Sequence, residues 1–162
     1  TGPMARLIRS AFVALFLWMV AWPLFVQAEP PQFERGALTI TTADGRKVDL
    51  DVEWAITAEQ RQHGLMFRES LGDREGMIFD FGTVREVTMW MKNTPLSLDM
   101  VFIEEDGRIS RIASRTTPYS EAIVASRGPV RYVLEIRGGQ AAALGINEGD
   151  RTDLARRPVP AN

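Results

Sequence analysis

The sequence predicts a mainly β protein, bordering on α+β, with a compact antiparallel sheet that is barrel-like or rolled and carries one or two short helices. Apolar and acidic residues alternate with period two in Lys47–Ile56, as in a strand with one dry and one wet face. Asp44-Gly45 and Asp106-Gly107 are turn dipeptides typical of hairpins. Many short strands leave edges that must be covered, which favours a rolled sheet.

The expected elements follow one another with short connections. Thr57 followed by Gln60 forms a capping box, and Gly64 stands where a helix would end, so a helix of about two turns is expected there. The alanine-rich run Gly138–Gly145 predicts a second short helix. Strands are expected at Gly36–Thr42, Lys47–Ile56, Met77–Phe81, Glu86–Met91, Leu96–Ile103, Arg108–Ala113 and Val130–Ile136.

The N-terminal residues have the features of an export signal that precedes the fold. Arg6 and Arg9 supply positive charge, Ala11–Val26 is apolar and uncharged, and Ala28 ends a small-residue cleavage motif. We therefore expect a signal peptide over residues 4–28, cleavage after Ala28, and a periplasmic or secreted protein. The apolar run is shorter than the roughly 20 residues of a membrane span, so a retained N-terminal membrane anchor is the less favoured alternative.

The rest of the chain is expected to form one domain without a membrane span. Residues 1–3 are interpreted as a tag remnant, 29–35 as a linker, 36–155 as a single β-rich domain and 156–162 as a flexible tail. The chain contains no cysteine, which excludes disulfides and a lipid anchor on cysteine. Its 19 Lys and Arg residues are scattered among 21 Asp and Glu residues, for a net charge of −2, so nucleic acid is not expected as a partner.

The stretch from residue 89 to 100, MWMKNTPLSLDM, is the main candidate for a functional site. Asp99 stands among apolar neighbours on a strand that is expected to be buried on both faces. A buried carboxylate needs an ion-pair or hydrogen-bond partner, and Lys92, Arg68, Asn93 or Thr94 could supply one. The pattern indicates either a structural tie to the Asn-Thr-Pro turn or a polar ligand pocket.

Catalysis would need a recognisable constellation of residues, and the sequence offers only a weak one. Asp99 and Glu135 could act as the acid and base of a hydrolase on envelope glycans. Glu135 could equally be paired with Arg131 or Arg137 on its own strand. Without a nucleophile motif or a phosphate-binding loop, the sequence favours a protein that is not an enzyme and needs no cofactor.

Methionines gather in the same part of the chain and raise the alternative of a soft-metal site. Met66, Met89 and Met91 lie near His63, the one histidine, and near the aromatic ring of Trp90. Thioethers bind Cu(I), which makes these residues copper-ligand candidates in an exported protein. Methionine also fills irregular cores, and core packing is the default interpretation.

Four runs in order, GLMFRESL, GMIFDF, MWMKNTPLSLDMVFIEEDGRI and YVLEIRGGQAAALGINEGD, are similar to the family called domain of unknown function 192. The resemblance covers Gly36 to Leu154, nearly all of the expected mature chain. It implies a compact β-rich domain without an assigned activity, and the family often looks exported in bacteria. It also singles out polar positions that packing does not explain: Arg68, Lys92, Asn93, Thr94, Asp99 and Glu135.

The leading hypothesis is an exported cell-envelope domain that binds a small ligand or an envelope protein through a polar pocket around Lys92, Asn93 and Asp99. A glycan-acting hydrolase and a copper-binding protein are the alternatives. The candidate ligand-binding residues are Arg68, Trp90, Lys92, Asn93, Thr94, Asp99 and Glu135.

Overall fold

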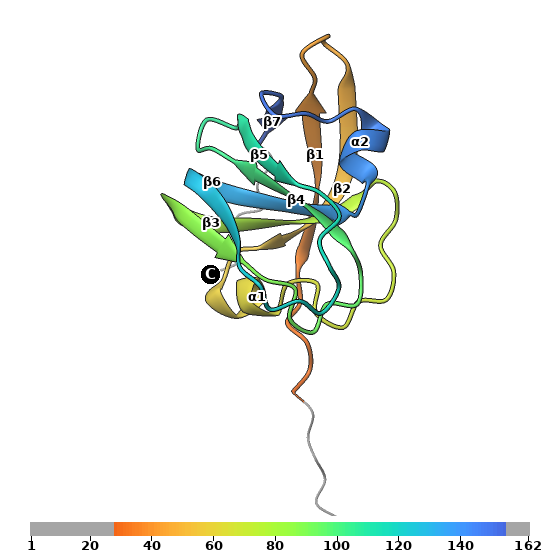
Figure 1. The fold of residues 1–162 in the computed structure, drawn as a ribbon, viewed down its shortest axis with the longest axis vertical. Helices are drawn as coiled ribbons and strands as arrows, with labels where there is room; N and C mark the ends of the chain where they lie inside the picture. Colours follow the sequence, from red (N-terminus) through yellow and green to blue (C-terminus); the bar gives the residue numbers. More distant parts are fainter. Residues whose placement is uncertain (1–27, 155–162) are drawn as a thin grey trace, which may run out of the picture.

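A computed structural model describes residues 28–154 and shows seven strands with two short helices (Figure 1), which confirms the mainly β prediction. The expected signal sequence through residue 27 and the expected tail after residue 155 lie outside the described residues. The elements are β1 (Glu34–Thr41), β2 (Lys47–Ala55), α1 (Ala58–His63), β3 (Glu75–Met89), β4 (Leu98–Ile103), β5 (Ile109–Ala113), β6 (Val124–Arg137), α2 (Gln140–Leu144) and β7 (Arg151–Asp153). Between residues 28 and 154, neither helix has the length and apolar character that crossing a membrane requires.

The strands form one sheet in the order β5-β4-β6-β3-β2-β1-β7, which curls into a half-barrel. All neighbours are antiparallel except β2 and β3, which run parallel, so the prediction of a wholly antiparallel sheet is wrong at this pair. The physical reason is the connection between them. A parallel pair needs a crossover instead of a tight turn, and α1 with the segment that follows it provides that crossover.

The two ends of the curled sheet approach each other on one side. Arg108 and Arg151 form an isolated antiparallel bridge between the edges of β5 and β7. The N–H of Ile109 donates to the carbonyl of Asp150 at 2.9 Å, and the N–H of Gly149 donates to the carbonyl of Ile109 at 2.8 Å. These bonds cover part of both sheet edges. Strand β7 has only three residues, too few for an alternating pattern, and the sequence did not predict it.

Strands β3 and β6 are longer than the sequence predicted. The 15 residues of β3 join two expected strands, and the pairing of β3 with β6 shifts register between Asp80 and Arg85 and between Glu86 and Thr88. Such irregularities break the alternating pattern without ending the strand. Strand β1 begins at Glu34, inside the segment 29–35 that was expected to be a linker.

The central strands β4 and β6 separate two hydrophobic clusters. All six residues of β4 are buried. Side chains alternate between the faces, so Leu134 and Ile136 of β6 pack in the first cluster while Val133 packs in the second, beside Met100 and Phe102 of β4. The second cluster lies on the face that α1 and the segment after it cover.

Helix α1 begins and ends as the sequence predicted. The Gln60 side chain accepts from the N–H of Thr57 at 3.0 Å, while the N–H of Gln60 donates to the Thr57 hydroxyl at 3.1 Å. Gly64 ends the helix with φ of +48°, and a Cβ there would lie 2.9 Å from the ring of Phe79. This close approach brings the end of α1 against β3, at the end of the molecule where the N-terminal segment arrives (Figure 1).

Asp99 anchors several loops to β4. Its side chain is fully buried, and its two oxygens accept from the N–H groups of Arg115 at 2.8 Å, Gly139 at 2.9 Å and Ala141 at 2.9 Å. The start of α2 and the segment after β5 are therefore held by one carboxylate. Asp99 thus has a structural role, but the expected tie to the Asn-Thr-Pro turn is wrong, because its bonds go to the segment after β5 and to the start of α2.

We expect Asp99→Ala to lower the free energy of unfolding by about 3 kcal/mol, because it leaves three N–H groups, that of Ala141 buried, without their acceptor and opens space in the core. Chemical denaturation measures this loss. The matched control is Asp51→Ala, which removes an exposed ion pair with Arg35 and should cost less than about 1 kcal/mol. Equal losses for the two variants would show that Asp99 is not an anchor.

Candidate functional site

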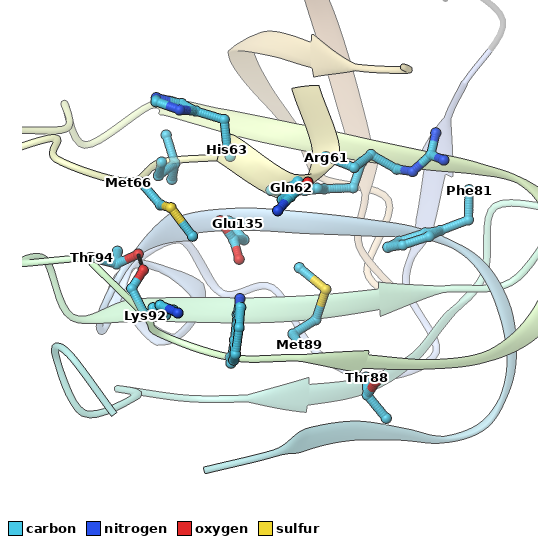
Figure 2. A pocket seen from close by; sticks show the side chains of 14 residues that line it. Arg61, Gln62, His63, Met66, Phe81, Thr88, Met89, Lys92, Thr94 and Glu135 are labelled. Atoms are coloured by element: carbon cyan, nitrogen blue, oxygen red, sulfur yellow. Dashed lines mark hydrogen bonds between the residues drawn. The ribbon is translucent and has the colours of Figure 1, made fainter. Parts of the chain in front are cut away.

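A cavity of about 190 Å³ opens on the α1 side of the sheet, and Glu135 of β6 is one of the residues that line it (Figure 2). Glu135 is only 4% exposed. The cavity is enclosed by α1 and the turn after it, by β3, and by the segment that follows β3. A carboxyl group at the base of a cavity, on the central strand of the sheet, is the main feature of this site.

No described residue forms a hydrogen bond or ion pair with the Glu135 carboxyl group. Burial alone raises the pKa of Glu135 to about 8. The carboxyl is therefore mostly protonated at pH 7, and it can both donate and accept a hydrogen bond. Buried polar groups are nearly always partnered, so an unpartnered one that faces a cavity points to a function for that cavity.

Two cationic side chains line the same cavity without pairing with Glu135. Arg61 donates to the carbonyl oxygens of Ile56 and Asp80, and its guanidinium lies 5.6 Å from the centre of the Phe81 ring. The Lys92 ammonium lies 5.0 Å from the ring centre of Trp90 and 3.8 Å from a carboxylate oxygen of Glu121. Both positive charges are held by groups other than Glu135.

The walls of the cavity are largely apolar. Leu65 and Phe79 belong to the second hydrophobic cluster, and Met89 packs at its edge. In Figure 2 the side chains of Met66 and Met89 extend from opposite sides toward Glu135. A ligand in the cavity would contact thioether and aromatic groups, which are polarizable and adapt to different shapes.

A wider groove of about 930 Å³ adjoins the cavity and shares Trp90 and Lys92 with it. The N-terminal segment 28–31 forms one side, and Phe67, which is 68% exposed, lies on the other. Trp90 is 42% exposed. The cavity thus opens into a groove that has large aromatic side chains at its surface.

Phe67 and Asn93, which line this groove, have strained backbone conformations, as does Tyr119 in the segment bonded to Thr94. Phe67, Asn93 and Tyr119 have φ of 64°, 53° and 61°, in the left-handed region that is unfavourable for residues with a Cβ. Hydrogen bonds hold these segments together: the N–H of Phe67 donates to the carbonyl of Asn93 at 2.8 Å, and that of Tyr119 to Thr94 at 3.0 Å. Each such conformation costs of order 1–3 kcal/mol, and strain of this kind clusters at functional sites.

The structure brings most of the predicted site residues together. Trp90, Lys92, Thr94 and Glu135 line the cavity. Asn93 and Arg68 line the adjoining groove, and Arg68 also pairs with Glu53 at 2.8 Å.

Asp99 is the exception among the predicted site residues. The sheet register places Asp99 opposite Ile136 and Met100 opposite Glu135, so the side chains of Asp99 and Glu135 lie on opposite faces of the sheet. The predicted pairing of Asp99 with Lys92 is wrong, because three backbone N–H groups occupy its carboxylate. The sequence could not show this, since these donors come from segments far along the chain.

The same geometry removes the predicted hydrolase mechanism. Two carboxyl groups that cleave a glycosidic bond must flank that bond from within one cleft. Asp99 and Glu135 are separated by the sheet itself, so they cannot act on one bond. The expected arginine partners of Glu135 are also wrong: Arg131 pairs with Asp80 at 3.3 Å and Arg137 pairs with Asp73 at 2.5 Å.

The copper-ligand candidates are only partly assembled. His63, Met66 and Met89 line the cavity, but Met91 is buried in the second cluster, where its sulfur accepts from the Thr116 hydroxyl at 3.2 Å. Figure 2 shows the His63 ring directed away from Glu135. Residues 28–154 contain no group of three or more His, Cys, Asp and Glu side chains that could hold a metal ion. Copper binding by the methionines stays a prediction.

Sequence reasoning missed several residues of the site. Arg61, Leu65 and Phe79 were read as helix or core residues, because nothing in their local pattern marks a cavity. For Glu135 a signal was present: a glutamate within the apolar run YVLEI of a central strand. A buried strand position is unusual for an ionisable residue unless it is paired.

The fold and this site together define a class: a small curled β sheet whose central strand presents a buried carboxyl to an apolar cavity. The family model for domain of unknown function 192 (DUF192), described as an uncharacterised ACR, matches residues 39–154. The chain belongs to this family, as the sequence motifs indicated. No curated protein matches the chain.

Two solved structures resemble the chain closely. A protein of Sinorhizobium meliloti 1021, described as a proposed transcription regulator, is 47% identical with a TM-score of 0.75, over 76% of this chain and 95% of its own. A protein of unknown function from Novosphingobium aromaticivorans DSM 12444 is 41% identical with a TM-score of 0.71, over 74% of this chain and 84% of its own.

The raised pKa of Glu135 predicts a specific dependence of stability on pH. Since the folded state keeps the proton between pH 4.5 and about 8 while the unfolded state loses it, burial of Glu135 lowers the free energy of unfolding across this range by about 4 kcal/mol. Below pH 4.5 both states are protonated and the penalty is absent.

Glu135→Gln should lack this loss, so denaturation between pH 4.5 and 8 should show the variant gaining stability relative to the unsubstituted protein. Glu59→Gln is the control on the exposed face of α1 and should follow the unsubstituted protein. Parallel pH profiles for Glu135→Gln and the unsubstituted protein would contradict the raised pKa.

Proposed function

We propose that this protein binds a small organic molecule in the cavity whose base is formed by Glu135. The observation that carries the proposal is a carboxyl group, 4% exposed, that faces a cavity and has no hydrogen-bond partner among the described residues. Leaving a buried polar group unpaired costs free energy, and a ligand that supplies the missing bond recovers it. The proposed site is therefore the pocket predicted around Lys92 and Asn93, but its carboxyl group is that of Glu135 and not that of Asp99.

The volume of the cavity supports a ligand of limited size. An engineered protein cavity of about 150 Å³ holds one benzene molecule. At about 190 Å³, this cavity suits a group of similar or slightly larger size. A larger ligand would extend past Trp90 and Lys92 into the adjoining groove, which has room for a second part of the molecule.

The strained opening supports binding over simple packing. Phe67, which lines the groove, is held in a left-handed conformation and is 68% exposed, so the fold gains no burial of its ring in return for the strain. A fixed aromatic surface beside a cavity loses little conformational entropy when a ligand arrives.

We also propose that the protein acts outside the cytoplasm. The support is the charged start, apolar run and small-residue cleavage motif in residues 4–28. Mass measurement of the protein from the cell envelope tests this: we expect a chain that begins at Glu29. A chain that keeps residues 4–28 and stays with the membrane would support the anchored alternative.

The description of the Sinorhizobium meliloti relative as a proposed transcription regulator is not carried over to this chain. Its net charge of −2 and its pI near 5.5 give little attraction for a nucleic-acid backbone. Arg61 and Lys92 at the site are engaged by protein groups.

Methionine methyl groups give a direct test of binding, because Met66 and Met89 line the cavity. We expect small amines, alcohols or carboxylic acids, added to the full chain with ¹³C-labelled methionine methyls, to shift the Met66 and Met89 signals.

Met89→Trp, which places a larger side chain in the cavity wall and so reduces the free space, should reduce binding at least tenfold. Val84→Trp is the control, since it introduces a tryptophan at an exposed position of the same strand. The proposal fails if no compound of these three classes shifts Met66 or Met89, or if both tryptophan variants bind alike.

A further inference from the structure

We propose that the ligand of this cavity is an organic cation: a primary ammonium group on a short apolar body, with the ammonium paired to Glu135. This inference rests on the proposed function and names the class of molecule that the site selects. It follows from three features of the cavity: its unused acceptors, the placement of its own cations, and the chemistry of its walls.

The first feature is a set of unused acceptors. The Glu135 carboxyl faces the cavity without a partner. Thr94, which is 5% exposed and lines the same cavity, donates its hydroxyl proton to the carbonyl of Lys92 at 3.0 Å, so the oxygen retains free lone pairs. An ammonium group has three N–H donors and no acceptor, which complements a carboxylate and a hydroxyl oxygen.

The second feature is that the protein directs its own cations elsewhere. Arg61 is bonded to backbone carbonyls, and the Lys92 ammonium faces Trp90 and Glu121. Both side chains line the cavity, but neither serves as the counter-ion of Glu135. The place of a counter-ion beside this carboxyl is therefore left to a ligand.

The positive charges of Arg61 and Lys92 would not prevent a cation from binding at Glu135. A charge that repelled an ammonium at Glu135 would equally favour the ionised carboxylate and lower its pKa. Burial is instead the one resolved cause of the pKa of Glu135, which is raised to about 8.

The third feature is the chemistry of the walls. Phe79 and Trp90 offer aromatic rings, whose faces attract cations, and Met66 and Met89 offer polarizable thioethers. The walls are otherwise apolar, which suits an alkyl or aryl body next to the ammonium group.

Binding has a defined proton balance. The protonated Glu135 carboxyl releases its proton to solvent, and the ligand keeps all three ammonium protons, giving a carboxylate–ammonium pair. At pH 7 the carboxyl must first lose its proton, and because its pKa is about 8, binding is about tenfold weaker than it would be to an already ionised carboxylate. An alkylamine stays protonated in this range, as lysine does with a pKa near 10.4. Affinity should therefore rise nearly tenfold per pH unit up to pH 8 and then level off.

Three probes of matched size test the inference: 1-pentylamine, 1-pentanol and pentanoate, each titrated by calorimetry into the full chain at pH 6.5, 7.5 and 8.5. We expect 1-pentylamine to bind at least tenfold more tightly than the other two at pH 7.5. Its affinity should rise with pH, and buffers of different ionisation enthalpy should reveal close to one proton released per molecule bound at pH 6.5 and clearly less than one at pH 8.5.

Variants assign the effect to the carboxyl. Glu135→Gln should abolish the pH dependence and weaken 1-pentylamine at least tenfold more than it weakens 1-pentanol. Thr94→Val should weaken 1-pentylamine more than 1-pentanol, which tests the site without touching Glu135. Glu121→Gln, an exposed carboxylate near the opening, is the matched control for unspecific attraction and should change affinity less than twofold.

The outcomes distinguish a failure of the organic-cation inference from a failure of the proposed small-molecule binding. Tighter binding of 1-pentanol or pentanoate than of 1-pentylamine, or amine binding that does not change with pH, would overturn the cation and leave a small-molecule site. If no probe shifts the methyl signals of Met66 and Met89, both the cation and the proposed function are overturned.

Discussion

Strands β4 and β6 are buried on both faces, and this constraint governs the rest of the structure. Any polar side chain on these strands must find a partner within the protein or beside a cavity. Asp99 and Glu135 lie on these strands, one on each face. These two strands therefore carry two buried carboxyl groups in different surroundings: Asp99 is bonded to backbone N–H groups, and Glu135 faces a cavity.

The difference follows from what covers each face. On the Asp99 side, the segment after β5 and the start of α2 direct their N–H groups at the carboxylate, which joins distant parts of the chain. On the Glu135 side, the end of α1 and the turn after it pack against β3. Gly64 lies against Phe79 there, and Phe67 is tied to the carbonyl of Asn93. The cover of this face is fixed in place, but it does not fill the space above Glu135.

An unpartnered carboxyl of this kind lowers stability at neutral pH, and the strained residues at the opening lower it further. Proteins retain such costs where function depends on them. The stabilising parts of the fold lie elsewhere, in the two hydrophobic clusters and in the Asp99 anchor. The energetics thus divide the molecule into a stabilising framework and a cavity whose lining and opening lower stability.

The sequence alone determined the local features of this protein. The Thr57–Gln60 capping box, the glycine that ends α1, the alternating strand β2 and the rolled sheet follow from short-range periodicity and turn chemistry, which act within a few residues. Only the tertiary structure decided the parallel pairing of β2 with β3, the donors that surround Asp99 and the space above Glu135. These depend on which distant segments meet, because the face and the neighbours of a buried carboxyl are set by register and crossover, and not by the residues next to it in the chain.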